Sequence, residues 1–359
     1  MAAALSGAAA VAGCAPAAPV PVPVAPPRAA APAPPEGCDA PLPDDSWMRP
    51  VGTLGEENIA ALQEKLDRDP LDLAARFRLA FAYPMRARHA LALPHFQWLV
   101  VHCPIAPVLE PAGYYVYSYA ARDDRDVAMD EIRRLFALAV AKYPRNATVL
   151  AHAAAFQGFG HEDEAIALLE RATAAAPEVG RFWFQLARVR RSLDLLPGHD
   201  AVDLRIVHED YRRGLALATE PDERVPALCD AALVALRIDA PEAAARWAEE
   251  LVASPATARG YVGVRAHNVG HTVLGVLALG RGALDEAKEH LRASADIAEK
   301  DTHVPPEAEL ARALLAAGEK DAVYDYVVSC MRWSDDPRLE RWRVALAEGT
   351  RLPWDAFRK

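Results

Sequence analysis

Residues 267–297 read HNVGHTVLGVLALGRGALDEAKEHLRASADI, and this stretch decides the fold. Two apolar helical patterns flank the Gly-Arg-Gly segment at 280–282, where glycine favours a turn. Small residues stand at Gly275, Ala287 and Ser294, separated by 12 and 7 positions. Because small side chains let two helices approach closely, the stretch predicts a helical hairpin with a tight crossing.

The same spacing recurs earlier in the chain. Steps of 12 and 7 residues connect two further sets of positions, namely Ala153, Ala165, Ala172 and Ala232, Ala244, Leu251. Ala187 also follows Ala153 by 34 residues, and a period near this length is typical of stacked helix–turn–helix units. Alternating runs of β-branched residues, which indicate strands, are nearly lacking after residue 44. We therefore expect an all-α fold, an α-solenoid of stacked hairpins.

These residues resemble the tetratricopeptide repeat family over residues 125–300, with an insertion, SLDLLPGHDAVDL, at 192–204. The wider chain is similar to a class of uncharacterised bacterial repeat proteins, through the segments Leu274–Leu291 and Gly318–Val323. The resemblance implies a right-handed α-solenoid whose concave groove binds a segment of another protein. No activity is settled for that class.

The chain divides by composition into five regions. In the N-terminal helical region we expect a helix over 86–102 that Pro94 kinks or breaks, because proline lacks the backbone N–H. The regions are a signal-type segment 1–14, a Pro/Ala-rich disordered tether 15–43, an N-terminal helical region 44–124, tetratricopeptide-like repeats 125–300 and C-terminal capping helices 301–359.

Residues 1–14, MAAALSGAAAVAGC, resemble the end of a bacterial lipoprotein signal peptide, in which Cys14 would receive the lipid. No Lys or Arg precedes the apolar stretch, so either the true start lies upstream or the match is accidental. The resemblance implies a chain attached to the membrane through Cys14, on the periplasmic face of a bacterial envelope and with the outer membrane as one destination. The alternative is a cytoplasmic chain with a disordered N-terminal tail.

Cysteine is sparse, and no Cys-x-x-Cys pair is present. Cys103, Cys229 and Cys330 lie within helical patterns, so we expect them to be small buried hydrophobic residues. Outside the cytoplasm a disulfide among them is an alternative, but no spacing favours one pair.

The charge of the chain argues against one class of partner. Its formal net charge is −10 and its pI is about 5.6, whereas a nucleic-acid-binding protein needs a basic face. The sequence also lacks a phosphate-binding glycine-rich loop, a nucleophile elbow and a dinucleotide fingerprint. We therefore expect a non-enzymatic protein that has no cofactor.

His267 and His271 are four residues apart and so share one helix face. Such a pair could ligate a metal, although no glutamate stands between them as in the His-Glu-x-x-His motif. Packing against neighbouring helices is the competing interpretation. The pair makes a metal-binding or catalytic helical protein the alternative function.

The helix expected over 180–191 carries the candidate groove residues. We expect Trp183, Leu186 and Ala187 to face the core. Arg181, Phe184 and Arg188 would then project on another side, which lines the concave groove in this family. Two arginines and an aromatic ring suit an acidic or carboxylate-ended peptide, so the sequence predicts a scaffold or adaptor that binds a protein partner there.

Overall fold

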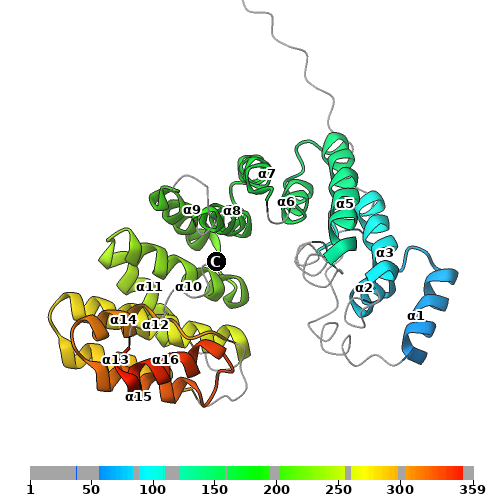
Figure 1. Ribbon diagram of the computed structural model, residues 1–359. Coiled ribbons are helices and arrows are strands. Elements are labelled where there is room, and N and C mark those ends of the chain that lie inside the picture. The colour runs from blue at the N-terminus through cyan, green and yellow to red at the C-terminus, as the bar shows by residue number, and fades with distance from the viewer. Residues whose placement is uncertain are drawn as a thin grey trace, which may run out of the picture.

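The computed structural model describes residues 38, 56–83, 89–107, 109, 122–157, 160–194, 202–254, 260–297 and 304–350. The expected lipidation site Cys14 and, apart from Cys38, the expected tether 15–43 lie outside the described residues. Within the described part, helices are the regular elements, as the sequence predicts (Figure 1). None of these helices combines the length and the apolar character that crossing a bilayer requires.

The helices of the N-terminal part are α1 Glu56–Arg68, α2 Leu73–Ala82, α3 His89–His102 and α5 Arg122–Lys142. The central helices are α6 Ala147–Ala155, α7 Glu162–Ala175, α8 Gly180–Leu193, α9 Leu204–Leu217, α10 Pro221–Arg237, α11 Pro241–Ala253, α12 Gly260–Gly280 and α13 Leu284–Ala295. The last helices are α14 Glu309–Ala316, α15 Lys320–Cys330 and α16 Pro337–Glu348.

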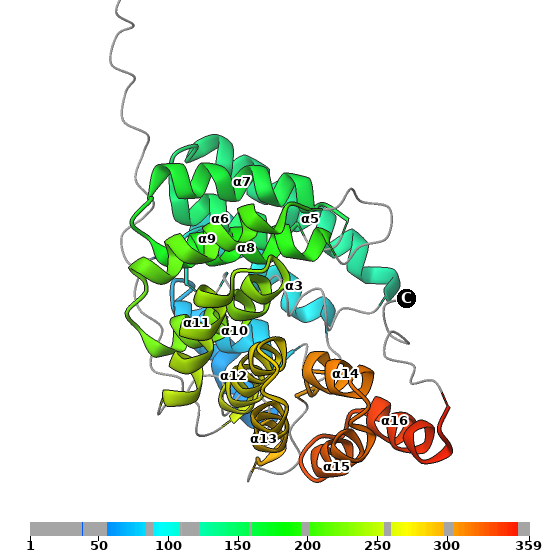
Figure 2. The same ribbon diagram turned by 90° about the vertical axis from the view of Figure 1, so that its left-hand side faces the viewer.

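Consecutive central helices pack in pairs, α6 with α7, α8 with α9, α10 with α11 and α12 with α13, and each pair also contacts the next. The pairs follow one another along an arch in Figure 1, and Figure 2 shows them one below another. Helices α6, α8 and α10 lie toward the inner side of the arch, and α7, α9 and α11 toward its outer side (Figure 1). The chain is therefore an α-solenoid of tetratricopeptide-like hairpins.

The turns and small residues of the sequence explain these pairs. Gly282, between α12 and α13, has a φ of 78°, which few residues other than glycine adopt without strain. A Cβ atom on Gly275 would lie 2.3 Å from a Leu310 side-chain carbon. Since that distance is too short for two carbons, the glycine is needed where α12 and α14 pack together.

Helix α3 is continuous from His89 to His102, so Pro94 does not break it, and the alternative outcome, a kink at Pro94, stays a prediction. Phe96, Leu99 and Val100 follow the proline and are all buried in the N-terminal core. Burial of each such side chain is worth about 1.5–3 kcal/mol, which offsets the hydrogen bond that proline removes.

A disulfide joins Cys38 to Cys103, which are 65 residues apart in the sequence. Cys103 is buried as expected but is paired, whereas Cys229 and Cys330 are free and buried. The pair could not be chosen from spacing because Cys38 reaches the end of α3 only through the tertiary fold. This bond fastens Cys38 to the N-terminal core.

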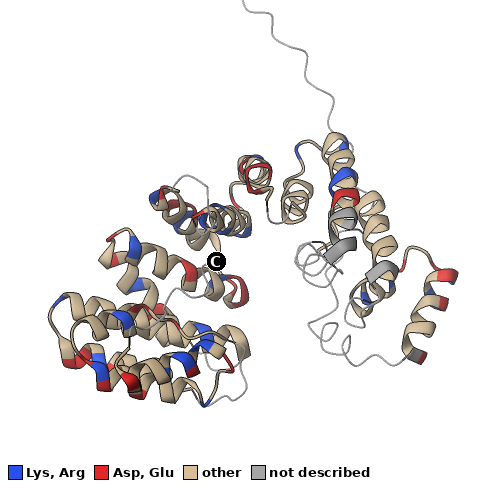
Figure 3. Ribbon diagram, in the orientation of Figure 1, with Lys and Arg blue, Asp and Glu red and all other residues tan. Residues whose placement is uncertain are grey.

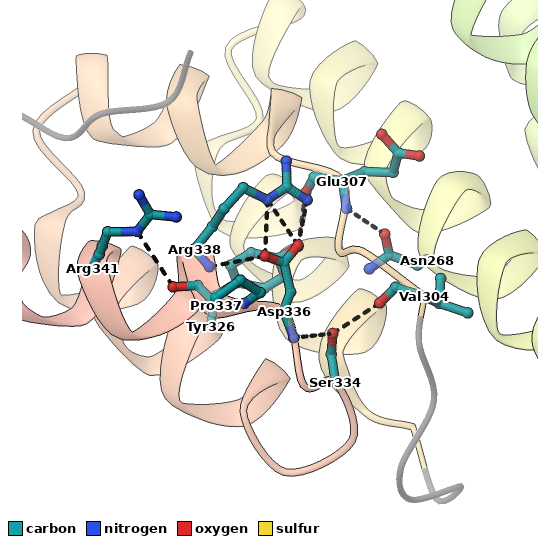
Figure 4. Close-up of polar contacts among 9 residues, drawn as sticks. All are labelled: Asn268, Val304, Glu307, Tyr326, Ser334, Asp336, Pro337, Arg338 and Arg341. Carbon is teal, nitrogen blue, oxygen red and sulfur yellow. Dashed lines mark hydrogen bonds and ion pairs between the residues drawn. The ribbon is translucent and has the colours of Figure 1, made fainter. Parts of the chain in front are cut away.

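Side chains of α12, of α15 and of the segment that follows α15 hold the connection that precedes α14. Asn268 of α12 accepts a hydrogen bond from the backbone N–H of Glu307 at 2.8 Å. Tyr326 of α15 donates to the Glu307 carbonyl at 2.7 Å, and Ser334 donates to the Val304 carbonyl at 2.9 Å. Figure 4 shows these contacts, with the Glu307 carboxylate extending away from them.

Candidate functional site

Helix α8 presents two opposite sides because a helix turns once in about 3.6 residues. One side lines a pocket between α7 and α9 and carries Trp183, Leu186 and Arg190. The other side carries the predicted groove residues together with one more arginine, namely Arg181, Phe184, Arg188 and Arg191. The second set lies on the side of α8 turned away from that pocket. Helix α8 itself lies toward the inner side of the arch (Figure 1).

Phe184 does not belong to an open surface, so its prediction as a groove residue is wrong. Its side chain is 2% exposed, and its ring lies 6.5 Å from that of Tyr211. A Cβ atom on Gly214 would lie 2.5 Å from the Phe184 ring. The ring therefore fills the space that a glycine leaves on α9, and it holds α8 against α9.

Trp183 faces the core as predicted, because it packs against the cluster that contains Leu186. It is only partly buried, however, and also lines the pocket between α7 and α9. Its indole N–H donates to the Pro177 carbonyl at 3.0 Å, which satisfies the polar N–H at the surface.

The inner side of the arch is organised around a buried carboxylate, Asp230 of α10. Its oxygen accepts a hydrogen bond from Arg265 of α12 at 2.6 Å and pairs with Arg191 of α8 at 3.1 Å. Tyr211 of α9 donates its hydroxyl to the other oxygen at 3.3 Å. Asp230 is 5% exposed, so one buried acid links four helices of three successive hairpins. We call these residues with Arg188 the inner arginine cluster.

The arginines of this cluster favour the ionised form of Asp230. Burial on its own raises the pKa of Asp230, but Arg191 and Arg265 outweigh burial and hold that pKa below its usual range. Arg188 lowers the pKa further and so lies near enough to act on the same carboxylate. Asp230 is therefore ionised, and the arginines around it still outnumber it.

Glu307 is the second acidic neighbour of the cluster. Its pKa is raised to about 7, first by burial and then by repulsion from the Glu309 carboxylate, against the opposing effect of Arg265. At neutral pH it is only partly ionised. Arg188 is exposed and forms no ion pair with another residue that the structure describes. The cluster thus keeps positive charge available to a ligand on the inner side.

Arg181 lies on the same side of α8 as the cluster, with its guanidinium carbon 5.2 Å from the Phe182 ring centre. Figure 3 shows basic and acidic residues interspersed over the arch, so the inner arginine cluster is a local feature. The roles of Arg181 and Arg188 in a groove stay predictions.

The sequence analysis did not single out Arg191, Asp230 and Arg265, although one signal was present. Asp230 is the one charged residue in the apolar run ALCDAALVAL at 227–236. A charge in such a run needs a partner when it is buried. Its partners are 39 and 35 residues away in the sequence, which is why only the stacked hairpins identify them.

His267 and His271 lie together, with ring centres 4.6 Å apart, and His290 of α13 joins them. Nδ1 of His271 lies 3.0 Å from Nδ1 of His290, and Nε2 of His267 bonds to the Ala293 carbonyl at 2.8 Å. Among the described residues, no group of three or more side chains is arranged to hold a metal ion. The geometry agrees with packing and hydrogen bonding of α12 on α13.

The histidine group makes stability depend on pH. Burial, with repulsion from His267 and His290, lowers the pKa of His271 from 6.5 to about 4. As pH falls below 6.5 the unfolded chain binds the proton first, so stability is lost between pH 6.5 and about 4. When pH falls from about 7 to about 4.5, we expect the free energy of unfolding to drop by about 2 kcal/mol more in the wild type than in His271→Gln. This figure is smaller than the full pKa shift would give, because His271 is partly exposed to solvent.

Urea unfolding of both proteins at the two pH values measures this difference. His95, whose pKa burial also lowers to about 4, is present in both and cancels. Equal losses in the two proteins would show that His271 is not the group responsible.

No family model matches the chain, and no curated protein matches it. Solved structures are similar to it at low identity. The crystal structure of MamA is 16% identical, with 48% of this chain and 90% of that chain covered and a TM-score of 0.38. A tetratricopeptide repeat protein from Parabacteroides merdae is 12% identical, with 80% of this chain and 99% of that one covered and a TM-score of 0.42.

Cut9, in the APC/C hetero-tetramer Cut9-Hcn1, is 14% identical, with 84% of this chain and 54% of that chain covered and a TM-score of 0.42. The last two comparisons cover most of this chain, but none of the three reaches the level at which details of a site can be transferred. The repeat spacing of the sequence and the consecutive pairing of helices both identify the fold as a tetratricopeptide-like α-solenoid.

Proposed function

We propose that this protein is a non-enzymatic scaffold or adaptor that binds an acidic segment of a partner protein on the inner side of the arch. The observation that carries the proposal is the inner arginine cluster, in which the Asp230 carboxylate orients Arg191 and Arg265. An arginine already held by one carboxylate loses little side-chain entropy when it binds a second, because its rotamer is set. Arg188 and Arg181 extend the positive surface along α8.

The charge of a partner follows from this surface. Guanidinium groups bind carboxylates through paired, charge-assisted hydrogen bonds. A segment rich in Asp and Glu, or one that ends in a carboxylate, would therefore bind better than a neutral segment of the same length. Charge on the inner side would act mainly on the rate of association and on specificity.

The test is a charge reversal with matched controls. We expect Arg181→Glu combined with Arg188→Glu to weaken the binding of acidic peptides at least about tenfold, a loss of about 1.4 kcal/mol. A peptide array that pairs each acidic sequence with its Asn/Gln counterpart provides the measurement. Arg145→Glu combined with Arg292→Glu changes the net charge equally but alters exposed residues elsewhere on the arch. Equal effects of the two double variants would exclude a specific inner site.

We also propose that the protein is lipid-anchored through Cys14 at the bacterial envelope. The lipobox-like segment 1–14 supports this location. The Cys38–Cys103 disulfide adds support, because disulfides persist mainly in oxidising compartments such as the periplasm. Fractionation of the host, with Cys14→Ser in parallel, tests the proposal. An unlipidated wild type that fractionates with the cytosol would contradict it.

A further inference from the structure

The outer side of the arch carries a pocket that is separate from the inner arginine cluster. It opens between α7 and α9, has α8 as its floor and holds a volume of about 470 Å³. Its α8 residues lie on the side of that helix opposite to Arg188 and Arg191, so a ligand in this outer pocket would not contact the cluster.

One wall of the outer pocket is apolar and already shaped. Leu186 is buried at its base, and Ile206 of α9 is 50% exposed at its edge. The Trp183 ring forms the rest of the wall and is oriented by the bond from its N–H to Pro177. A half-exposed isoleucine beside a fixed tryptophan ring offers apolar area that a ligand can bury without rearranging the protein.

Most charges around the outer pocket are paired within the protein. Arg190 donates to Asp210 and to Glu170, in both cases at 2.5 Å. Arg213 donates to Glu209 at 2.8 Å, and its guanidinium carbon lies 5.0 Å from the Trp183 ring centre. Arg190 thus faces two carboxylates and Arg213 faces one, and these pairs orient the charged side chains of the walls.

Arg205 is the exception. It lines the outer pocket from α9 and is exposed, and its side chain makes no ion pair or hydrogen bond within the described part of the chain. Its guanidinium is therefore the one at this rim that no carboxylate of the described residues pairs with. Because Arg205 and Ile206 are consecutive residues, an anionic group bound by the first must lie close to the apolar group that covers the second.

We propose that the outer pocket binds the C-terminal residue of a partner chain that ends in a large apolar side chain. The apolar side chain would cover Trp183, Leu186 and Ile206, and the terminal carboxylate would pair with Arg205. A C-terminal residue carries its side chain and its carboxylate on one Cα atom, so these two groups can reach Ile206 and Arg205 at the same time. An internal Asp or Glu would place them on different residues.

The test uses small probes of defined chemistry on the full-length protein. The probes are N-acetyl-Phe-Leu with a free carboxylate, its C-terminal amide, and N-acetyl-Leu-Asp-amide. Fluorine NMR of protein labelled with 5-fluorotryptophan reports on the site, and Trp183→Phe assigns the Trp183 signal. We expect the free carboxylate to shift this signal saturably and to bind at least about fivefold more tightly than the amide.

Arg205→Glu should abolish the preference for the free carboxylate, and Arg292→Glu, an exposed change on α13, should leave it intact. Equal binding of acid and amide, or no shift of the Trp183 signal, would overturn the proposal. Tighter binding of N-acetyl-Leu-Asp-amide would overturn the assignment to a chain terminus. Because Arg181 and Arg188 lie on the opposite side of α8, failure here would leave the inner-side proposal unaffected.

Discussion

Replacement of Cys103 by serine is expected to lower the free energy of unfolding of the N-terminal helices by about 4 kcal/mol. The disulfide closes a loop of 65 residues, and such a crosslink restricts the unfolded chain by about this amount in the chain-entropy account. In a stacked-hairpin protein each unit depends mainly on its neighbours. The loss should therefore be concentrated in α1, α2, α3 and α5.

Hydrogen exchange of oxidised wild type and Cys103→Ser measures this loss helix by helix. Dithiothreitol should reproduce the loss in the wild type and have no effect on Cys103→Ser, since Cys229 and Cys330 are free. Uniform loss along the whole arch, or no loss in α1–α5, would contradict a local crosslink. The same comparison tests whether the disulfide forms in the envelope, because protein from that compartment should be oxidised when isolated.

Replacement of Asp230 by alanine is expected to cost about 3 kcal/mol, because removing one partner of a buried ion pair leaves the other without compensation. Arg191 and Arg265 would both lose their carboxylate, and the Tyr211 hydroxyl would lose its acceptor. The cost should be near the lower end of the usual range, because the side chains of Arg191 and Arg265 are 28% and 23% exposed.

Glu340→Ala is the matched control, since Glu340 pairs with Arg343 at 2.6 Å on the surface of α16. Exposed pairs of this kind contribute little to the free energy of unfolding, because solvent screens them. Urea unfolding of both variants gives the comparison. A double-mutant cycle with Arg191→Met and Arg265→Met then separates the two pairs. A cost for Asp230→Ala as small as that for Glu340→Ala would show that the cluster does not hold the hairpins together.

Variants of Asp230 also test the proposed binding of acidic peptides. If Asp230 orients the arginines, Asp230→Asn should fold more stably than Asp230→Ala, because the amide keeps an acceptor oxygen. Its acidic-peptide binding should nevertheless differ from that of the wild type. If the proposed function holds, the same residues serve both the stability of the stacked hairpins and the binding of a partner.

Local features of the sequence were enough to predict the hairpins. Helix α12 ends at Gly280 and α13 begins at Leu284, on either side of the turn predicted at the Gly-Arg-Gly segment. Caps, glycine turns and the placing of small residues act within a few positions of the chain, so they can be recognised without tertiary contacts. The same holds for the repeat spacing near 34 residues.

The candidate site was predicted less well, because its contacts join residues that are far apart in the sequence. The sequence correctly placed Leu186 and Ala187 in the core, but it placed Phe184 in the groove, whereas Phe184 is buried more deeply than Trp183. The two aromatic residues are adjacent on one helix, so their types alone do not say which is buried more deeply. Which of them is buried depends on the glycine that α9 presents opposite, Gly214, 30 residues away.

The sequence by itself determined that this protein consists of stacked helical hairpins, because periodicity, turns and caps are local interactions. The tertiary structure alone decided which charges meet. Asp230 contacts Arg191 and Arg265 only when three hairpins stack, and Cys38 meets Cys103 only when the N-terminal helices pack. Within the described ranges, the acidic residues that line the outer pocket with Arg205 pair with other arginines. Ion pairs and disulfides between residues far apart in the sequence depend on distances in the folded chain. Local sequence patterns do not specify these distances.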